Sequence, residues 1–305
     1  MTHITEHKRI HLIGIGGCSM SGLASILKNR GYYVQGSDRA ESPFTERLKE
    51  LGIPVFIGHD AKNIGDCDLI IFSAAIKSDN VERAEAKRRG IPELERSEAL
   101  GQLTEGYESV VGIAGCHGKT TITSMLALIC EQGGPDATVH IGGFVDFLNG
   151  GVRLGAHDMF ITEACEYVES FLTLRPTIAL INNIDNDHLD YYGDMEHIVA
   201  AFKKFAALLP ENGLLIGNTD DFRVRALMAE HTGRKLSYGM KDADYTPANI
   251  TYDDNGCPGF DIMFRGEKLM HIQLRIPGEH SVMNAIAAAA VAREIGADDK
   301  CIVSA

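Results

Sequence analysis

The stretch that decides the fold is Ser109-Val110-Val111-Gly112-Ile113-Ala114-Gly115-Cys116-His117-Gly118-Lys119-Thr120-Thr121. Its apolar first half predicts a buried strand, and its glycines predict a tight turn that opens a helix over residues 122–130. A glycine loop between a strand and a helix turns backbone N–H groups toward the phosphates of a nucleotide. Lys119 would then reach the terminal phosphates, and the Thr120 hydroxyl would bind Mg²⁺. The predicted nucleotide-binding residues are Gly115, Cys116, His117, Gly118, Lys119, Thr120 and Thr121.

This loop is shorter than the full G-x-x-x-x-G-K-T pattern. The fifth position before Gly118 is Ile113, and the nearest preceding glycine is Gly115. The plain alternative is a glycine turn followed by a surface lysine. The strand before the loop and the helix after it favour a nucleoside triphosphate as the ligand.

An earlier glycine loop, Gly14-Ile15-Gly16-Gly17-Cys18-Ser19-Met20, also follows an apolar run and precedes a helical pattern. Gly36-Ser37-Asp38 ends the next predicted strand, so an acidic residue follows the loop as it does in dinucleotide-binding folds. Ser19 stands where the third glycine of that fingerprint would be. The loop is therefore compatible with NAD, with another nucleotide or nucleotide sugar, or with plain packing of a helix on a sheet.

Apolar runs alternate with helical patterns in both parts of the chain, which predicts an α/β fold with mainly parallel sheets. The pattern loosens over residues 101–108, so we place a domain boundary there, with domains at 1–106 and 107–305. Alternating residues at 259–264 and 269–274 flank Arg265-Gly266 and predict a hairpin. We expect a Rossmann-like N-terminal domain and a P-loop-type central ATPase domain whose mainly parallel sheet has added antiparallel strands.

Charge and composition exclude several classes of protein. The 305 residues carry 29 Lys and Arg against 42 Asp and Glu, a formal charge of −13, which disfavours nucleic acid as a partner. The densest basic cluster, Lys87-Arg88-Arg89, lies in a Glu-rich stretch over residues 81–90 that predicts a solvent-exposed helix face. No apolar run reaches the ~20 residues of a membrane-spanning helix. Seven scattered cysteines without a CxxC pair favour the reducing cytoplasm. We expect a cytoplasmic protein with neither a membrane nor a nucleic-acid partner, and the sequence leaves its oligomeric state open.

Two polar clusters follow later strands of the second domain. Glu163 and Glu166 follow the apolar run 159–162, and His188 ends the segment 182–188 that follows the run 178–181. Ligands bind beyond the carboxyl ends of parallel strands, so both clusters are expected near Lys119. Glu163 offers an oxygen ligand for Mg²⁺, whereas His188 by itself is typical of a histidine hydrogen-bonded at a strand end.

An alanine-rich helix is predicted over residues 282–294. His280 and Asn284, four residues apart at its start, would share one helix face. They could contact the base or ribose of a nucleotide, and helix capping explains them equally well.

Several of these motifs occur together in a fixed order along nearly the whole chain. They are Ile13-Gly14-Ile15-Gly16-Gly17 with Met20, Gly36-Ser37-Asp38, Ser73-Ala74-Ala75-Ile76 with Asn80, the G-x-H-G-K-T-T loop, Glu163-Ala164-x-Glu166 with Ser170-Phe171-Leu172, Asn183-Ile184 with Asp187-His188, and Pro277-Gly278-x-His280 with Asn284-Ala285. In this order they resemble the motifs of the Mur ligase family. Many motifs in one order are far more specific than any single glycine loop.

The resemblance implies a function for each domain. The first would bind UDP rather than NAD, and the second would bind ATP and Mg²⁺. The implied reaction is ATP-dependent amide formation between UDP-N-acetylmuramate and L-alanine through an acyl phosphate, in peptidoglycan precursor synthesis. The implied UDP-sugar contacts are Gly16, Gly17, Ser37, Asp38, Ser73, Glu166 and Asn183.

By the same resemblance, the catalytic residues are Lys119, Glu163 and His188. The Mg²⁺ ligands would be Thr120, Glu163 and His188, and His280 and Asn284 would join the ATP site. Cys116, Cys165 and Glu169 depart from residues common in the family. The family continues into a third, Rossmann-like domain beyond the position of Ala305, so we expect this chain to bind ligands without full turnover.

Three alternatives remain open from the sequence. A related ligase attaches the tripeptide L-Ala-γ-D-Glu-meso-diaminopimelate to the same UDP-sugar and shares most of these motifs. A binding module would hold UDP-sugar or nucleotide without turnover. An NAD-dependent oxidoreductase is favoured by the first glycine loop alone, and the second loop argues against it.

Overall fold

The computed structural model describes residues 2–305, apart from the side chains of residues 156 and 157. The chain divides into two compact units. One comprises the residues up to Gly106 together with His140–Leu154, and the other comprises Tyr107–Val139 and Gly155–Ala305. The described helices include none that is long and apolar enough to cross a membrane.

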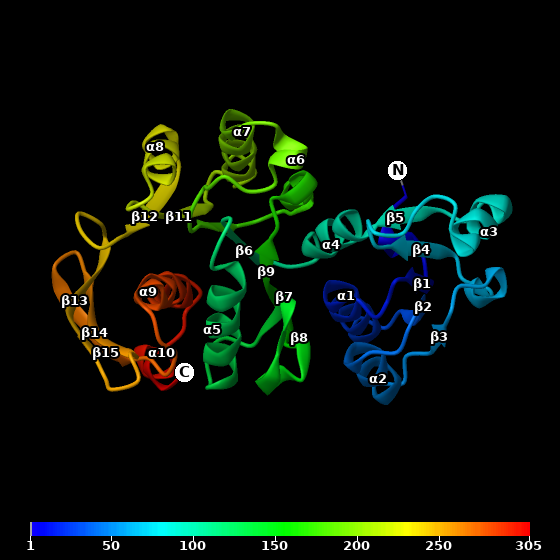
Figure 1. Cartoon of the computed structure of the whole chain (residues 1–305), viewed down its shortest axis with the longest axis horizontal. Coiled ribbons are helices and arrows are strands. Elements are labelled where there is room, and N and C mark those ends of the chain that lie inside the picture. The colour runs from blue at the N-terminus through cyan, green and yellow to red at the C-terminus, as the bar shows by residue number, and fades with distance from the viewer. Residues whose placement is uncertain (1) are drawn as a thin grey trace. The chain divides into compact units, whose positions relative to one another are not determined.

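The first unit contains a five-stranded parallel sheet with the order β3-β2-β1-β4-β5 (Figure 1). Its strands are β1 (Arg9–Ile13), β2 (Tyr33–Asp38), β3 (Val55–Ile57), β4 (Leu69–Phe72) and β5 (Glu93–Glu95). Ile13 at the end of β1 lies opposite Ser37 on β2 and opposite Phe72 on β4. The strand order reverses between β1 and β4, which is the place where open α/β sheets bind their ligands.

Helices cover both faces of this sheet. They are α1 (Cys18–Asn29), α2 (Pro43–Glu50), α3 (Val81–Arg89) and α4 (Arg96–Thr104), with the 3₁₀ helices η1 (Ile4–Glu6) and η2 (Ala61–Ile64). Figure 1 shows α1 and α2 together on one face and α3 on the other. The predicted solvent-exposed face is confirmed for Lys87, Arg88 and Arg89, which are exposed, whereas Glu82 and Ala86 of the same helix are fully buried.

The second unit is built on a longer sheet with the order β15-β14-β13-β12-β11-β10-β6-β9-β7-β8. Its strands are β6 (Ser109–Ala114), β7 (Ala137–Val145), β8 (Gly150–Arg153), β9 (Ala156–Ala164), β10 (Ile178–Ile181), β11 (Leu214–Asn218), β12 (Arg234–Tyr238), β13 (Tyr245–Tyr252), β14 (Pro258–Phe264) and β15 (Glu267–Gln273). Residues of β7 from His140 onward, the 3₁₀ helix η3 (Asp146–Leu148) and β8 belong to the first unit.

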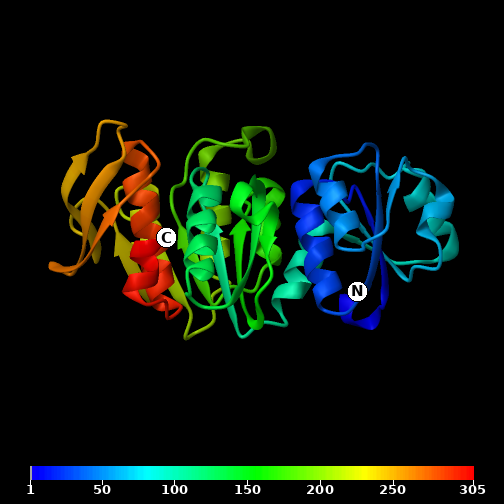
Figure 2. The ribbon, with the colours of Figure 1, turned by 90° about the horizontal axis from the view of Figure 1, so that it is seen from below.

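Strand directions in this sheet confirm the predicted fold class. The run from β9 through β6, β10, β11 and β12 to β13 is parallel. Strands β13, β14 and β15 are antiparallel to one another, as the hairpin around Arg265-Gly266 predicts. Figure 2 shows these three strands, in orange, at one end of the sheet beside the red helix α9 (Glu279–Glu294).

The remaining helices of this unit are α5 (Lys119–Glu131), α6 (Leu189–Tyr192), α7 (Met195–Ala206), α8 (Phe222–Glu230), α10 (Asp299–Ser304) and the 3₁₀ segment η4 (Tyr167–Thr173). Figure 1 shows α5 and α9 on one face of the sheet and α7 and α8 on the other. Small alanine side chains let α9 pack closely, and its residues 284–292 are all buried. The parallel strands therefore end together at one edge, where their following loops can form a site.

Candidate functional site

The loop after β6 has the backbone of a phosphate-binding loop. Gly115 and Gly118 have positive φ values of 141° and 85°. A Cβ on Gly118 would lie 2.5 Å from the Asn182 side-chain nitrogen and 2.7 Å from the Asn284 side-chain oxygen, so only glycine fits. Gly118 is the N-cap of α5. Because the first amides of a helix lack intrahelical acceptors, this helix start can receive an anion.

Two asparagines at the end of β10 hold the loop in place. The Asn183 amide bonds both backbone groups of His117, at 2.8 Å to its nitrogen and 3.0 Å to its oxygen. Asn182 donates to the same His117 carbonyl at 2.9 Å and accepts from the Tyr238 hydroxyl at 2.6 Å. Sequence reasoning missed Asn182 and Tyr238, although the Asn-Asn pair was a signal for the first. Asn183, predicted to contact the UDP-sugar, here positions the phosphate loop.

Cys116 contributes its side chain as well as its backbone. Its thiol donates to the Asp185 carbonyl at 3.3 Å and accepts from the Asp185 N–H at 3.1 Å. Burial raises the pKa of the Cys116 thiol to about 11. The thiol is therefore neutral at physiological pH and ties the phosphate loop to the segment after β10.

Lys119, at the first position of α5, turns back across the loop. Its ammonium lies 2.8 and 3.0 Å from the two carboxylate oxygens of Glu166 and donates to the Gly115 carbonyl at 2.5 Å. The Glu166 side chain is 1% exposed, and its backbone carbonyl accepts from the Tyr192 hydroxyl. Lys119 and the buried carboxylate of Glu166 thus form an ion pair beside the loop.

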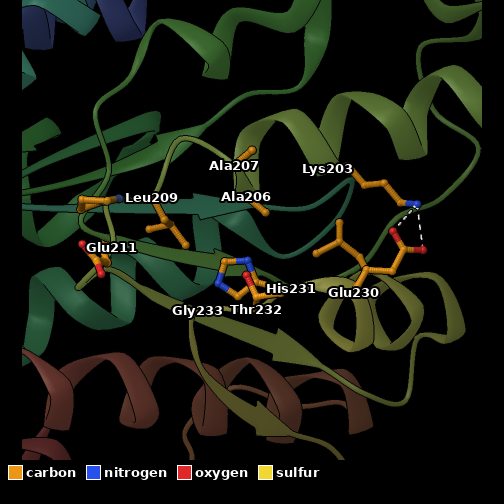
Figure 3. Close-up of a pocket in the computed structure, with 11 residues that line it drawn as sticks. Lys203, Ala206, Ala207, Leu209, Glu211, Glu230, His231, Thr232 and Gly233 are labelled. Atoms are coloured by element: carbon orange, nitrogen blue, oxygen red, sulfur yellow. Dashed lines mark hydrogen bonds and ion pairs between the residues drawn. The ribbon is translucent and has the colours of Figure 1, made fainter.

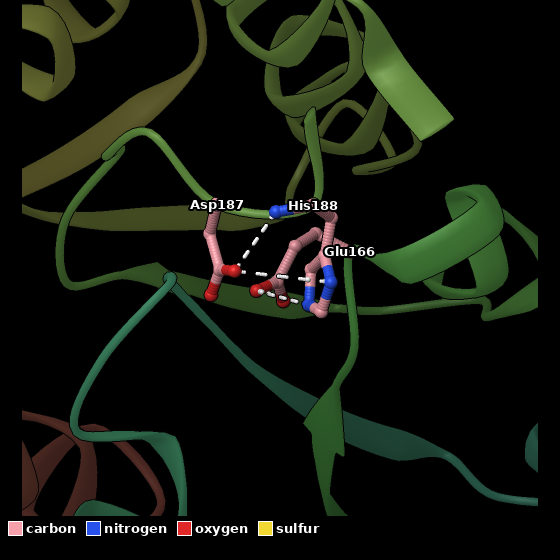
Figure 4. Close-up of side chains that lie close together, drawn as sticks. All are labelled: Glu166, Asp187 and His188. Atoms are coloured by element: carbon pink, nitrogen blue, oxygen red, sulfur yellow. Dashed lines mark hydrogen bonds and ion pairs between the residues drawn. The ribbon is translucent and has the colours of Figure 1, made fainter. Parts of the chain in front are cut away.

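Glu166, Asp187 and His188 form a group that could hold a metal ion (Figure 4). Their ligand atoms all lie within 4.8 Å of one another. Carboxylate oxygens are suitable ligands for Mg²⁺. The Lys119 ammonium, itself a cation, already forms an ion pair with Glu166 in this group. The donor set therefore fits a divalent cation.

The other two predicted metal ligands come from β9 and from the start of α5. Glu163 lies on β9 opposite Ile113, before the last strand residue, and is not a member of this three-residue group. Thr120 is exposed in the first turn of α5.

The backbone around the metal group is strained. His188 has a φ of 53°, and Val168 and Glu169, just after Glu166, both have a φ of 54°. This left-handed conformation is costly for a β-branched residue such as Val168, and such strain concentrates at functional sites.

The residues predicted on α9 meet the phosphate loop. A pocket of about 470 Å³ is lined by His117, Gly118 and Thr121 together with His280 and Asn284. Asn284 is buried and accepts from the Asn182 amide at 3.4 Å, whereas His280 is exposed. The fold therefore brings both α9 residues to the loop, as a nucleotide site requires.

A second hollow of about 530 Å³ lies between the ends of α7 and α8 (Figure 3). Lys203 and Glu230 form an ion pair at its rim, with a shortest distance of 2.7 Å. His231 and Gly233 line it just before β12 begins. It thus lies at the amino ends of the parallel strands, the edge opposite the phosphate loop.

The first unit gathers the predicted UDP-sugar residues around the earlier glycine loop. The Ser37 carbonyl accepts from the N–H groups of Gly14 at 2.8 Å and Ile15 at 3.0 Å. The Gly16 N–H donates to the Asp38 carboxylate at 2.8 Å. Ser73 lies beside Gly14, where a Cβ would be 3.5 Å from the serine Cβ. The end of β2 therefore sets the course of this loop, and Gly17 caps the helix α1 that follows.

Ser19 has a structural task that explains the missing third glycine. Its hydroxyl lies 3.2 Å from His140 Nε2 and accepts from the Arg96 guanidinium at 3.2 Å. The neighbouring Gly22 lies under the same imidazole, because a Cβ there would be 2.9 Å from its ring. Burial lowers the pKa of His140 to about 4, so its ring is neutral.

Comparison with known proteins matches both parts of the chain to one family. The Mur ligase family, catalytic domain, matches residues 9–108, and the Mur ligase middle domain matches residues 113–292. A UDP-N-acetylmuramate--L-alanine ligase of Alkaliphilus metalliredigens is 45% identical over 303 residues, which are 98% of this chain and 66% of that protein. The one of Clostridium botulinum strain Langeland is 44% identical over 98% of this chain and 65% of its own length. The chain spans about two thirds of the length of these curated relatives.

Solved structures show the same fold. UDP-N-acetylmuramate-alanine ligase MurC from Thermotoga maritima has a TM-score of 0.85 at 29% identity, over 98% of this chain and 67% of that one. UDP-N-acetylmuramate:L-alanyl-gamma-D-glutamyl-meso-diaminopimelate ligase from Neisseria meningitides has a TM-score of 0.85 at 28% identity, over 98% and 97%. Since the middle-domain family alone matches more than half of the chain, the chain belongs to the Mur ligase family.

Proposed function

We propose that this chain carries the UDP-sugar-binding and ATP-binding parts of a ligase that joins L-alanine to the lactyl carboxylate of UDP-N-acetylmuramate. The observation that carries the proposal is the phosphate loop with Lys119 beside the group Glu166, Asp187 and His188. The relatives at 43–45% identity are named UDP-N-acetylmuramate--L-alanine ligases, which supports this substrate pair. Seven scattered cysteines without a CxxC pair support a place in the reducing cytoplasm.

ATP would bind at the start of α5, in the domain that we place at residues 107–305. The loop from Gly115 to Thr121 would surround the phosphates, and Lys119 would exchange Glu166 for the terminal phosphate. His280 and Asn284 line the adjoining pocket and would contact the base or the ribose. The Lys119 charge acts where negative charge develops during phosphoryl transfer.

Mg²⁺ would be held by Glu166, Asp187 and His188, with Thr120 and Glu163 as further proposed ligands. When bound, the ion would offset the negative charge of the ATP phosphates. The buried Glu166 carboxylate would stay neutralised as Lys119 turns toward ATP, because the ion would replace the ammonium.

Amide formation needs ATP because a free carboxylate is a poor electrophile. The lactyl carboxylate would attack the terminal phosphorus of ATP and release ADP. The amine of L-alanine would then attack the resulting acyl phosphate, and phosphate would leave. We assign catalytic roles to Lys119, Glu163 and His188.

The UDP-sugar would bind in the domain that we place at residues 1–106, at Gly16, Gly17, Ser37, Asp38 and Ser73. These residues meet at the carboxyl ends of β1, β2 and β4. Glu166 and Asn183 stay proposed contacts of the sugar, although their side chains here bind Lys119 and His117.

Calorimetric titration with UDP-N-acetylmuramate, with NAD as the control, tests the first domain. The proposal expects saturable binding of the UDP-sugar and none of NAD. Binding of NAD alone would overturn it. Phosphate release with L-alanine, compared with the tripeptide, then tests the substrate, since the solved tripeptide ligase has the same TM-score as the alanine ligase.

A further inference from the structure

A fully buried carboxylate belongs to the first unit and has no part in the function proposed above. Glu82 is the second residue of α3, and its side chain is 0% exposed. Polar groups from three other places in the unit converge on it: His11 on β1, Ser37 at the end of β2, and His59, Asp60 and Asn63 in and around η2.

Each Glu82 oxygen has its own set of partners. Oε2 accepts from the Ser37 hydroxyl at 2.5 Å and from His11 Nε2 at 3.4 Å, and it lies 3.3 Å from His59 Nδ1. Oε1 accepts from the Asn63 amide at 2.8 Å and from the Asp60 N–H at 3.3 Å. All these groups can donate, as an ionised carboxylate requires.

His11 lies between Gln35 and Glu82. Gln35 Nε2 donates to the Asn63 carbonyl at 2.8 Å, which identifies this atom as the amide nitrogen. The same nitrogen lies 3.2 Å from His11 Nδ1, while His11 Nε2 faces Glu82. His11 thus connects Gln35 on β2 to the buried carboxylate.

The Glu82 carboxylate stays ionised. Burial by itself would raise the pKa of Glu82, but hydrogen bonds from His11, Ser37 and Asn63 outweigh it and lower the pKa to about 2. An ionised carboxylate only accepts, so the Ser37 hydroxyl must direct its proton at Glu82. The lone pairs of that hydroxyl then face the remaining donors, which are His59 Nδ1, 3.1 Å away, or a ligand.

Ser37 connects the Glu82 carboxylate to the glycine loop. Its carbonyl accepts from Gly14 and Ile15, and the next residue, Asp38, accepts from Gly16. The first three amides of the loop are therefore bonded to the end of β2, whose serine is anchored by Glu82. A shift of Ser37 would move the loop with it.

We infer that Glu82 is a positioning residue of the sugar-nucleotide site, which holds Ser37 and, through it, the Gly14–Gly17 loop in the conformation that receives the ligand. This inference rests on the function proposed for the first unit. Helix α3 would then do more than pack against the sheet, because its Glu82 carboxylate also sets the direction of the Ser37 hydroxyl.

The variant Glu82→Gln tests the inference. Its amide NH₂ must face a donor in a pocket made of donors, so Ser37 or its neighbours have to shift. We expect the Kd for UDP-N-acetylmuramate, measured by calorimetry on this chain, to rise about tenfold, the effect of one lost hydrogen bond. The Kd for ATP with Mg²⁺ should not change. The matched control is Glu85→Gln on the same helix, which pairs with Arg88 and Arg89 and should leave both Kd values unchanged.

Calorimetry separates positioning from stability. If Glu82 only stabilised the unit, Glu82→Gln would lower the fraction of binding-competent chains while the Kd of the folded fraction stayed at the wild-type value, and the inference would be overturned. Absence of UDP-sugar binding by the wild-type chain would instead overturn the proposed function.

Ser37→Ala tests the route through the serine and serves if Glu82→Gln does not fold. We expect it to weaken UDP-sugar binding by a similar factor, and a wild-type Kd would overturn the route. The double variant should bind no more weakly than the weaker single variant, because both changes break one connection. Fully additive losses would show that Glu82 acts independently of Ser37.

Discussion

The ammonium of Lys119 lies 2.8 Å from one carboxylate oxygen of Glu166 and 3.0 Å from the other. The side chain that should bind nucleotide phosphates is therefore already paired with a carboxylate that has almost no contact with water. Glu166 also connects Lys119 to the metal group. His188 Nε2 lies 3.9 Å from Glu166 Oε1, the oxygen that is 3.0 Å from the ammonium. In the proposed function, Glu166 would therefore exchange the Lys119 ammonium for the metal ion while Lys119 turns to the nucleotide phosphates.

Lys119→Ala should weaken nucleotide binding and also destabilise the second unit. We expect ATP affinity to fall by about 100-fold, since a charged hydrogen bond to phosphate is lost. The Glu166 charge would remain buried without a cation, which costs about 3 kcal/mol in the free energy of unfolding. Calorimetric titration with ATP and thermal unfolding measure the two effects separately.

The double variant Lys119→Ala/Glu166→Gln is the control for this prediction. Replacing the unpaired Glu166 carboxylate by an uncharged amide should restore most of the free energy of unfolding without restoring ATP binding. An unfolding temperature of the single variant equal to that of the wild type would show that the ion pair does not stabilise the unit.

His188→Ala should weaken divalent metal binding by at least about tenfold, because one of the three candidate ligands is removed. Mn²⁺ serves as a spectroscopic probe for Mg²⁺, and its free fraction is measured by electron paramagnetic resonance. The matched control is His197→Ala, an exposed histidine of the same unit whose ring nitrogen lies 2.8 Å from the carboxylate of Asp194, the N-cap of α7. Equal Mn²⁺ affinity in both variants would argue against the metal group.

Stability should fall between pH 6.5 and pH 4 through His140. Burial lowers the pKa of this imidazole from 6.5 to about 4. In that window the unfolded chain takes up a proton that the folded chain cannot, so about 3 kcal/mol of stability, fully present above pH 6.5, is lost as the pH falls. The thermal midpoint of His140→Gln, measured across this range, should show a smaller decrease than that of the wild type. Parallel curves would contradict the assignment.

The Cys116 thiol should resist alkylation at neutral pH. Burial raises its pKa to about 11, so almost none of the reactive thiolate is present at pH 7. Iodoacetamide labelling followed by mass spectrometry should modify Cys116 more slowly than the half-buried Cys301. Rapid labelling of Cys116 would show that the phosphate loop opens often enough to expose it.

Local patterns predicted most elements at the residues where they occur. The strands Ser109–Ala114 and Ile178–Ile181 and the helix Val81–Arg89 coincide with their predicted ranges. Each is a run whose apolar or helix-forming residues suffice to identify it. The missed elements before the predicted domain boundary include the strand β5 and the helix α4. The strand has only three residues, and the helix is too mixed in polarity to show a period.

The sequence by itself determined which backbone segments form the site. Glycines at 115 and 118, the lysine after them and polar residues directly after apolar strands are local features, and the order of a parallel sheet places them at one edge. It could also identify the family from the order of its motifs.

Only the tertiary structure decided which side chains bond to one another. Asn182 meets Asn284 across 102 residues, and Lys119 meets Glu166 across 47. Glu82 looked like one more surface acid of a charged helix, yet it is buried and holds Ser37. Hydrogen bonds of this kind depend on how strands and helices pack together. No local pattern of residues specifies which residues, far apart in the sequence, this packing brings into contact.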